Sequence, residues 1–263
     1  MLDELRIDEQ AVAEKVAAFI RATVHQAGLD GAVIALSGGI DSAVTAYVTV
    51  EALGPDAVRL YNMPYETSNP ESEAHARLVA DDLGAPFEVI SVTPQIDAYF
   101  DRFPEADRLR RANKMARERM SVIYDMGKLH HAMVVGTGNK TETLLGYTTI
   151  WGDMACGIAP IGDLYKAQVR QLAQFLGVHE PIIQKPPSAD LWAGQTDEDE
   201  LGLTYNEADA ILYRLIECDK TPDEIVEDGA SPETVRKVLQ RVEHNEFKRR
   251  MPPVCDLSQF IRG

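Results

Sequence analysis

The sequence has few cysteines and no long hydrophobic run. Its three cysteines, Cys156, Cys218 and Cys255, are odd in number and never form a C-x-x-C pair, which argues against a disulfide framework and against a zinc ribbon. A reducing compartment is the simpler expectation. No stretch approaches the roughly 18 apolar residues of a membrane span, and the acidic, polar start does not resemble a signal peptide. We therefore expect a cytoplasmic protein that does not bind membranes.

Basic residues are also scarce: 26 Lys and Arg against 42 Asp and Glu leave a formal net charge of −16 over 263 residues. So acidic a chain repels polyanions, which excludes nonspecific binding of nucleic acid as a function. The acid is concentrated at 190–230, where we expect solvated helix faces. The arginines and lysine between 108 and 119 fit a solvated helix face and a site for an anionic substrate equally well.

Short apolar runs alternate with amphipathic segments along the first two thirds of the chain. Strands are expected at 32–36, 58–63, 87–92 and 132–135, and helices at 7–25, up to 53, 70–84, 94–103, 106–128 and 163–176. This alternation predicts an α/β fold with a doubly wound parallel sheet. Capping-box spacings at 204–207 and 221–224 then indicate a helical C-terminal extension.

We expect a single domain over 1–263, because no internal repeat or low-complexity linker divides the chain. Its predicted parts are an N-terminal helix at 7–26, a nucleotide-binding α/β core at 30–180, and a C-terminal lid with helices at 181–263. The Pro-rich and acid-rich loops 64–70 and 186–203 are predicted to be lids that exclude water from a reaction.

The segment Ser37-Gly38-Gly39-Ile40-Asp41-Ser42 follows the first predicted strand and opens the next helix. The carboxyl end of a parallel strand and the amino end of a helix face the same crevice, which favours an anion there. The glycines let backbone N–H groups approach a phosphate, and the serines add hydroxyl donors. The loop is not a Walker A loop, since no Lys follows the glycines. Asp41 beside a phosphate implies Mg²⁺ between the two anionic groups.

This S-G-G-x-D-S loop resembles that of the ATP pyrophosphatase (PP-loop) superfamily. Further segments are similar to NAD synthetases in order and spacing; they begin at Gly136, Gly146, Trp151, Pro160, Lys185, Gln195, Leu201 and Phe247. The resemblance covers nearly the whole chain and implies an adenine nucleotide alpha hydrolase-like fold. It also implies a ligase that amidates deamido-NAD to NAD with ammonia and ATP, through an adenylate, releasing AMP and pyrophosphate.

The same resemblance implies roles for individual residues. Asp41 and Lys166 are expected to be catalytic, and Asp41 and Glu142 are expected to bind Mg²⁺. The residues expected to contact ATP, the co-substrate, are Ser37, Gly38, Gly39, Ile40, Asp41, Ser42, Thr137, Lys166 and Ser188. Those expected to contact deamido-NAD are Arg117, Phe247 and Lys248. The family forms this second site across a two-fold interface, which implies a homodimer.

Two positions depart from the pattern of ammonia-dependent members, which commonly carry Lys-Tyr-Gly-Asp and a further Asp four residues on. This chain has Ile150 in place of the lysine and Gly157 in place of the second aspartate. Segments 152–157 and 245–250 are more similar to the synthetase half of glutamine-dependent enzymes. The chain has no room for a fused glutaminase, so we expect either free ammonia or a separate glutaminase. The departures also leave a different carboxylate substrate open.

The sequence is compatible with two other classes of function. Another PP-loop amidase or thiolase could adenylate a different carboxyl or carbonyl substrate, although a tRNA thiolase usually needs paired cysteines and a basic RNA face. A nucleotide-binding module without catalysis would need the phosphate loop more than it would need both Asp41 and Glu142. The leading prediction is therefore an NAD synthetase.

Overall fold

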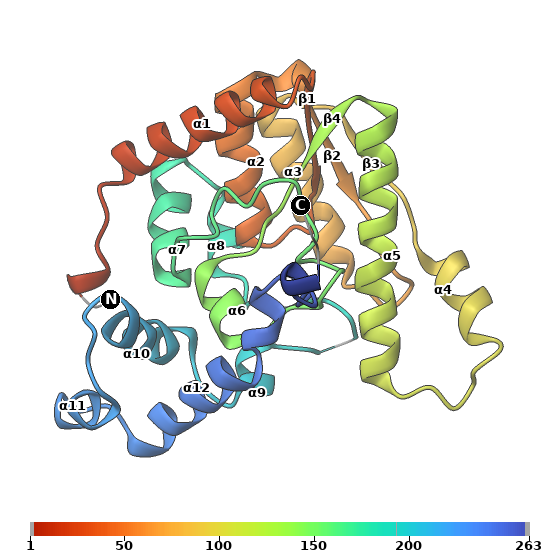
Figure 1. The fold of residues 1–263 in the computed structure, drawn as a ribbon. Coiled ribbons are helices and arrows are strands. Elements are labelled where there is room, and N and C mark those ends of the chain that lie inside the picture. Colours follow the sequence, from red (N-terminus) through yellow and green to blue (C-terminus); the bar gives the residue numbers. More distant parts are fainter. Residues whose placement is uncertain (1–2, 193, 261–263) are drawn as a thin grey trace.

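The computed structural model describes residues 3–192 and 194–260 and is built on a parallel sheet in the order β3-β2-β1-β4 (Figure 1). The strands are β1 (Gly31–Ala35), β2 (Val58–Asn62), β3 (Phe87–Val89) and β4 (Ala132–Val135). Ala32 of β1 pairs with Val58 on one side and with Met133 on the other. β1 is thus an interior strand, which explains why its sequence is continuously apolar.

Helices cover both faces of the sheet, as the doubly wound prediction requires. One face packs against α1 (Glu9–Gln26), α2 (Ile40–Leu53), α3 (Pro70–Leu83), α7 (Lys166–Phe175) and α8 (Glu180–Gln184). The other packs against α4 (Thr93–Phe100) and α5 (Arg108–Leu129), which stands apart on its own side of the sheet in Figure 1. Successive residues of β1 divide between these two cores, Ile34 in the first and Val33 in the second.

Several predicted boundaries were wrong. The strand predicted at 87–92 ends at Val89, because β3 is an edge strand paired only with β2 and α4 begins at Thr93. The helix predicted from 163 begins at Lys166, after a turn, and the first helix begins at Glu9. The short helix α6 (Lys140–Leu145) was not predicted; an Asn139–Glu142 capping box starts it.

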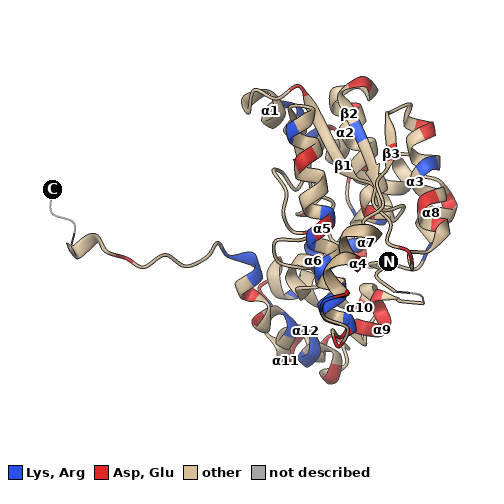
Figure 2. Cartoon of the chain, turned by 90° about the vertical axis from the view of Figure 1, so that its right-hand side faces the viewer, with Lys and Arg blue, Asp and Glu red and all other residues tan. Residues whose placement is uncertain are grey.

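The C-terminal extension is helical, as expected, and consists of α9 (Asp197–Leu201), α10 (Tyr205–Ile216), α11 (Pro222–Glu227), α12 (Pro232–His244) and the 3-10 helix η3 (Glu246–Arg249). Both predicted capping boxes are present, at the starts of α10 and α11. The extension shares a third apolar core with α6 and α7, which contribute Leu145 and Ala167. Residues 251–260 then run away from the body as an extended arm (Figure 2).

The sheet order places a topological switch point between β1 and β4. From β1 the chain proceeds outward to β2 and β3 and then returns to β4 on the opposite side of β1. Loops leaving two such strands diverge and open a crevice at their carboxyl ends. The loops there are 36–39 and 136–139. None of the helices within the described ranges combines the length and apolar composition of a membrane span.

Candidate active site

The loop after β1 is held by its own serines. The Ser37 and Ser42 hydroxyls lie 3.1 Å apart, Ser42 Oγ donates to the Gly39 carbonyl at 2.9 Å, and Gly39 N–H donates to Ser37 Oγ at 3.3 Å. Gly39 is the N-cap of α2, and no described side chain caps that helix. A helix N-terminus without a side-chain cap offers N–H donors and a positive dipole end to an anion.

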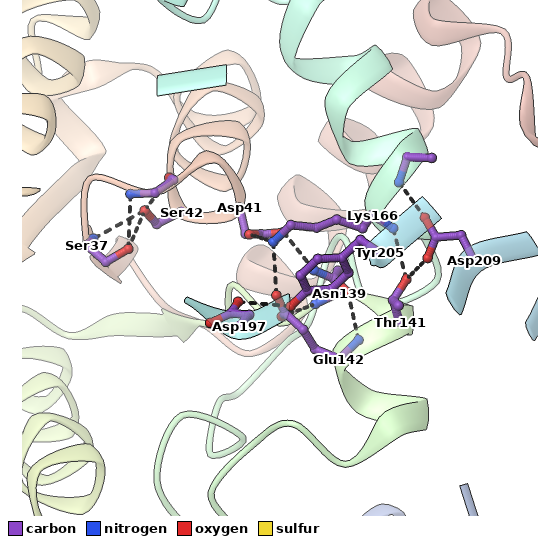
Figure 3. A network of polar contacts seen from close by, with 12 residues as sticks. Ser37, Asp41, Ser42, Asn139, Thr141, Glu142, Lys166, Asp197, Tyr205 and Asp209 are labelled. Carbon is purple, nitrogen blue, oxygen red and sulfur yellow. Dashed lines mark hydrogen bonds and ion pairs between the residues drawn. The ribbon is translucent and has the colours of Figure 1, made fainter. Parts of the chain in front are cut away.

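A buried lysine joins two carboxylates beside this loop (Figure 3). Lys166 Nζ lies 2.5 Å from Asp41 Oδ2 and 3.0 Å from Glu142 Oε1, and the lysine is only 2% exposed. Asn139, which is fully buried, donates from Nδ2 to Asp41 Oδ1 at 2.8 Å. The first turns of α2, α6 and α7 thus bring their polar side chains to the switch point.

The charges of this network are strongly coupled. Burial raises the pKa of Glu142 to about 7; the Lys166 ammonium opposes this rise and the Asp41 carboxylate adds to it. Burial by itself would lower the pKa of Lys166, but the carboxylates of Asp41 and Glu142 outweigh it and raise the pKa above its usual range. Lys166 is therefore a stable cation at neutral pH, positioned to neutralise only part of the surrounding negative charge.

Asp197 adds a third carboxylate from the predicted lid. Tyr205 donates its hydroxyl hydrogen to Asp197 Oδ2 at 2.9 Å, and Lys166 Nζ lies 4.9 Å from the centre of the Tyr205 ring. Burial raises the pKa of Asp197. The Lys166 ammonium and the hydroxyls of Tyr205 and Tyr147 oppose this rise in pKa. Asp197 is therefore a buried carboxylate held by neighbouring donors at the edge of the network.

The donor set fits a magnesium ion that is shared with phosphate. Asp41 and Glu142 both contact the same ammonium group, so their oxygens converge on one point. Within the described chain, no cluster of three or more His, Cys, Asp or Glu residues could hold a metal alone. Mg²⁺ is commonly bound by one or two carboxylates with substrate phosphates and water completing the shell. The two carboxylates could therefore bind Mg²⁺ once a phosphate ligand is present.

A cleft of about 350 Å³ begins at Ser37 and runs along the ends of β1 and β2. Tyr61, Met63 and Arg119 line it, and Arg119 Nε donates to the Met63 carbonyl at 2.8 Å. The two predicted lids meet at its rim, where Asn69 N–H donates to Asp190 Oδ1 at 2.9 Å. A largely apolar cleft next to an anion site suits a nucleoside attached to phosphates.

Thr137 and Ser188, the other side chains predicted to contact ATP, lie outside the Lys166 network. Thr137 is half-buried in the turn that follows β4, at the switch point. Ser188 is exposed, and its hydroxyl accepts a hydrogen bond from Asp190 N–H at 3.1 Å. The structure thus brings Thr137 to the crevice, while Ser188 lies in the predicted lid segment 186–203 and makes none of the described hydrogen bonds of the Lys166 network.

The predicted deamido-NAD residues surround a different segment, 146–150. Arg117 Nε donates to the Ile150 carbonyl at 3.2 Å, and Lys248 Nζ donates to the carbonyls of Gly146 and Thr148 at 2.7 and 2.9 Å. Phe247 is 60% exposed. Burial lowers the pKa of Lys248, which is partly buried beside these carbonyls. The three residues therefore belong to one surface, next to the end of α6.

Met133 fills the space beside position 157. A Cβ on Gly157 would lie 2.3 Å from Met133 Sδ, so an aspartate could be placed there only if Met133 moved. At position 150 the backbone carbonyl, rather than a lysine side chain, is the group in contact with Arg117. Position 157 thus has little room for a side chain, and position 150 contacts Arg117 through its backbone.

Sequence reasoning missed the role of the acidic block. The prediction of solvated faces was wrong for Asp197 and Asp209, which are 4% and 0% exposed. A signal was available in α10, because Asp209 lies four residues after buried Tyr205 and three before buried Leu212. Asn139 and Thr141 were also missed as members of the site, although both lie in the quoted motif beginning at Gly136.

The basic stretch 108–119 is largely occupied by packing. The guanidinium groups of Arg108 and Arg111 lie 4.3 and 4.6 Å from the ring centres of Trp192 and Phe100, and Lys114 pairs with Glu118. Arg119, by contrast, lines the cleft. Apart from Arg119, these contacts fit the expected helix face, which here also packs against neighbouring rings, better than a site for an anionic substrate.

Comparison with known proteins gives a consistent answer. The family model for NAD synthase matches residues 12–252. A curated relative from Trichlorobacter lovleyi, named NH(3)-dependent NAD(+) synthetase, is 51% identical over 257 residues, covering 98% of this chain and 94% of that protein. The structure of an NH3-dependent NAD synthetase from Campylobacter jejuni, in complex with the nitrate ion, has 33% identity and a TM-score of 0.82, covering 95% of this chain and all of that one. NMN synthetase from Francisella tularensis has 28% identity and a TM-score of 0.86, covering 96% and 100%.

Proposed function

Because the chain belongs to the NAD synthase family, we propose that it catalyses the ATP-dependent amidation of deamido-NAD to NAD with ammonia. One observation carries this proposal: the uncapped N-terminus of α2 lies beside the Lys166 bridge between Asp41 and Glu142. The chain also matches an ammonia-dependent relative over almost its full length. The reaction needs charge neutralisation and positioning rather than a side-chain nucleophile, and this site offers both.

In this proposal ATP binds in the crevice at the switch point. The nicotinate carboxylate attacks the α-phosphorus, pyrophosphate leaves, and ammonia then displaces AMP from the adenylate to form the amide. The N–H groups of the α2 N-terminus and the Ser37 and Ser42 hydroxyls would hold the phosphates, and the 350 Å³ cleft would take the adenosine. Mg²⁺, held by Asp41 and Glu142, would neutralise phosphate charge. Lys166 would stabilise the negative charge that develops on the leaving pyrophosphate.

The remaining site assignments are proposals of the same kind. Gly38, Gly39 and Ile40 would supply backbone contacts to ATP, with Thr137 and Ser188 adding side-chain contacts from the crevice and from the lid. Arg117, Phe247 and Lys248 would contact deamido-NAD next to segment 146–150. The N-terminal helix, the α/β core and the C-terminal helices would form a single functional domain, since the extension supplies Asp197 and Tyr205 to the core site.

One assay tests the reaction and the nitrogen donor. Purified protein with ATP, Mg²⁺ and deamido-NAD is incubated with ammonium or with glutamine, and AMP and NAD are quantified. We expect NAD and AMP in equal amounts with ammonium and no NAD with glutamine alone. Activity with glutamine alone would contradict ammonia dependence, and restored glutamine use after adding a separate glutaminase would support the two-protein arrangement.

The likeness to an NMN synthetase makes a second substrate worth testing in the same assay. Nicotinate mononucleotide carries the same reacting carboxylate but lacks the AMP half of deamido-NAD. We expect kcat/KM to favour deamido-NAD by at least about tenfold, the discrimination that roughly 1.4 kcal/mol of additional binding would supply. A preference for the mononucleotide would assign the chain to that substrate instead, with ATP activation unchanged.

A homodimer and a cytoplasmic location complete the proposal. The arm 251–260, which extends from the body (Figure 2), supports the dimer. Four of its side chains are apolar and exposed to solvent. They are Met251, Val254, Leu257 and Phe260, from 53% to 92% exposed. Burying each such side chain is worth about 1.5–3 kcal/mol, so a second copy that covers the arm would gain substantially. The free cysteines Cys156, Cys218 and Cys255 agree with a reducing compartment.

Deleting residues 251–263 is expected to weaken dimerisation by at least about tenfold, since contributions of more than 1.4 kcal/mol are lost. Sedimentation equilibrium measures the dissociation constant directly. A full-length variant with serine at the four apolar positions separates apolarity from chain length and should weaken the dimer similarly. An unchanged dissociation constant in both variants would remove the arm from the interface, and a monomeric wild type with full activity would contradict the dimer.

A further inference from the structure

Two side chains from other elements hold the first turn of α7. Lys166 N–H donates to Thr141 Oγ1 at 2.9 Å, and Ala167 N–H donates to Asp209 Oδ2 at 2.7 Å. The N–H groups of a first helical turn have no partner within the helix, so these bonds add to the local cap, in which Tyr165 N–H donates to Gln168 Oε1 at 2.9 Å. The start of α7 is therefore fastened to α6 through Thr141 and to α10 through Asp209 (Figure 3).

Thr141 connects the two bonds. While its oxygen accepts from Lys166 N–H, its hydroxyl hydrogen is donated to Asp209 Oδ1 at 2.5 Å. Both oxygens of Asp209 are thus in use, one holding α6 and the other holding α7. This arrangement fixes the direction of the Thr141 hydroxyl, because a hydroxyl has only one hydrogen to donate.

Asp209 is an unusual group to bury. It is 0% exposed, and its partners in these bonds are a hydroxyl and a backbone N–H rather than an ammonium or guanidinium group. A carboxylate at a helix N-terminus gains from the helix dipole, but removing it from water costs several kcal/mol. Stability alone therefore gives little reason for a carboxylate at this position.

The groups that Asp209 holds are next to the reacting side chains. Thr141 directly precedes Glu142, and Ala167 directly follows Lys166. The bridge of Lys166 Nζ to Glu142 Oε1 at 3.0 Å and to Asp41 Oδ2 at 2.5 Å requires that α6 and α7 keep their relative register. A shift of the α7 start would withdraw Lys166 from both carboxylates together.

We propose that Asp209 is a positioning residue for the amidation: it locks α6 to α7 so that Lys166 and Glu142 face Asp41. The inference rests on the proposed function, which places these three side chains at ATP and Mg²⁺. It makes the C-terminal helical extension part of the machinery, because α10 supplies the group that sets the geometry of the core site.

Asp209→Asn preserves the shape but turns one of the two acceptors into a donor, which then faces either Ala167 N–H or the Thr141 hydroxyl. We expect kcat to fall by about 10²-fold, as for a displacement of roughly 1 Å at a reacting group. The KM for deamido-NAD should stay within a factor of about two, because the loss concerns positioning in the transition state rather than substrate binding. Thr141→Val should lower kcat in the same way, and Thr141→Ser, which keeps the hydroxyl, should retain it.

A double-mutant cycle with Lys166→Met tests whether Asp209 acts through the lysine. If it does, Asp209→Asn should lower kcat in the Lys166→Met background by less than about twofold. Amide hydrogen exchange at Lys166 and Ala167 should be faster in Asp209→Asn, a readout that does not depend on turnover. Ile225→Val, a matched change in the same apolar core, should lower the thermal midpoint without changing kcat at 25 °C.

The outcomes are separable. An inactive wild type would contradict the proposed function, whereas an active wild type with unchanged kcat in Asp209→Asn would overturn the positioning role. The same fall in kcat in both backgrounds would also overturn it, since a general structural defect does not require Lys166.

Discussion

Asp41→Asn is expected to lower the turnover of deamido-NAD by on the order of 10³-fold, the scale of losing a preorganised electrostatic group at a reacting phosphate. The carboxylate accepts from Lys166 and Asn139 and is one of the two groups that converge on the proposed metal position. An amide is isosteric but neutral, so it keeps the shape while weakening both the ion pair and metal binding. Pyrophosphate release in the first turnover measures the affected step.

The magnesium dependence identifies the cause of that loss. Asp41→Asn and Glu142→Gln should both need higher Mg²⁺ for half-maximal activity, since each removes one charged ligand. Asp8→Asn is a matched control, because Asp8 caps α1 through Ala11 N–H, away from the crevice, and its kcat should not change. Normal turnover of Asp41→Asn at the wild-type Mg²⁺ optimum would eliminate the metal role of this carboxylate.

The fold could be predicted because its signals are local. The continuous apolar sequence of β1 indicated a strand covered on both faces, and Asn69-Pro70 marked the start of α3 with a cap and a proline. The strand-loop-helix at 32–42 then located the crevice without any tertiary information. The helix α6 was not predicted because its six residues are too few to show a helical period.

Sequence periodicity did not predict which distant residues meet in the site; only the family motifs did. Asp41 and Lys166 are 125 residues apart and Asp41 and Asn139 are 98 apart, and no periodicity shows that such groups meet. The family resemblance brought Glu142 and Lys166 to Asp41, but it gave no role to Asp209, which reads as one acid among many in an acidic block. Asp209 is buried because α10 packs against α7, and the pattern of charges along the sequence does not reveal this tertiary contact.

Gly38→Ala is expected to destabilise the protein by at least about 3 kcal/mol, more than left-handed backbone strain alone, which costs roughly 1–2 kcal/mol. Gly38 has φ +79°, and a Cβ there would lie 2.0 Å from the Ser72 carbonyl oxygen in α3. That contact is backbone against backbone, so no side chain can rotate to relieve it, and the loop must move away from α3. The urea midpoint measures the loss.

Gly84→Ala separates the clash from the strain. Gly84 has φ +62°, but a Cβ there meets nothing within 4 Å, so only the left-handed backbone is penalised and about 1 kcal/mol is expected. If Gly38→Ala lost no more than Gly84→Ala, the close approach of the loop to α3 would not be needed for folding. Displacing the loop should also misalign the α2 N–H groups, so ATP affinity measured by calorimetry should fall by about 10²-fold in Gly38→Ala and remain unchanged in Gly84→Ala. Equal ATP affinity in the two variants would show that the position of the loop against Ser72 is not what organises the phosphate site.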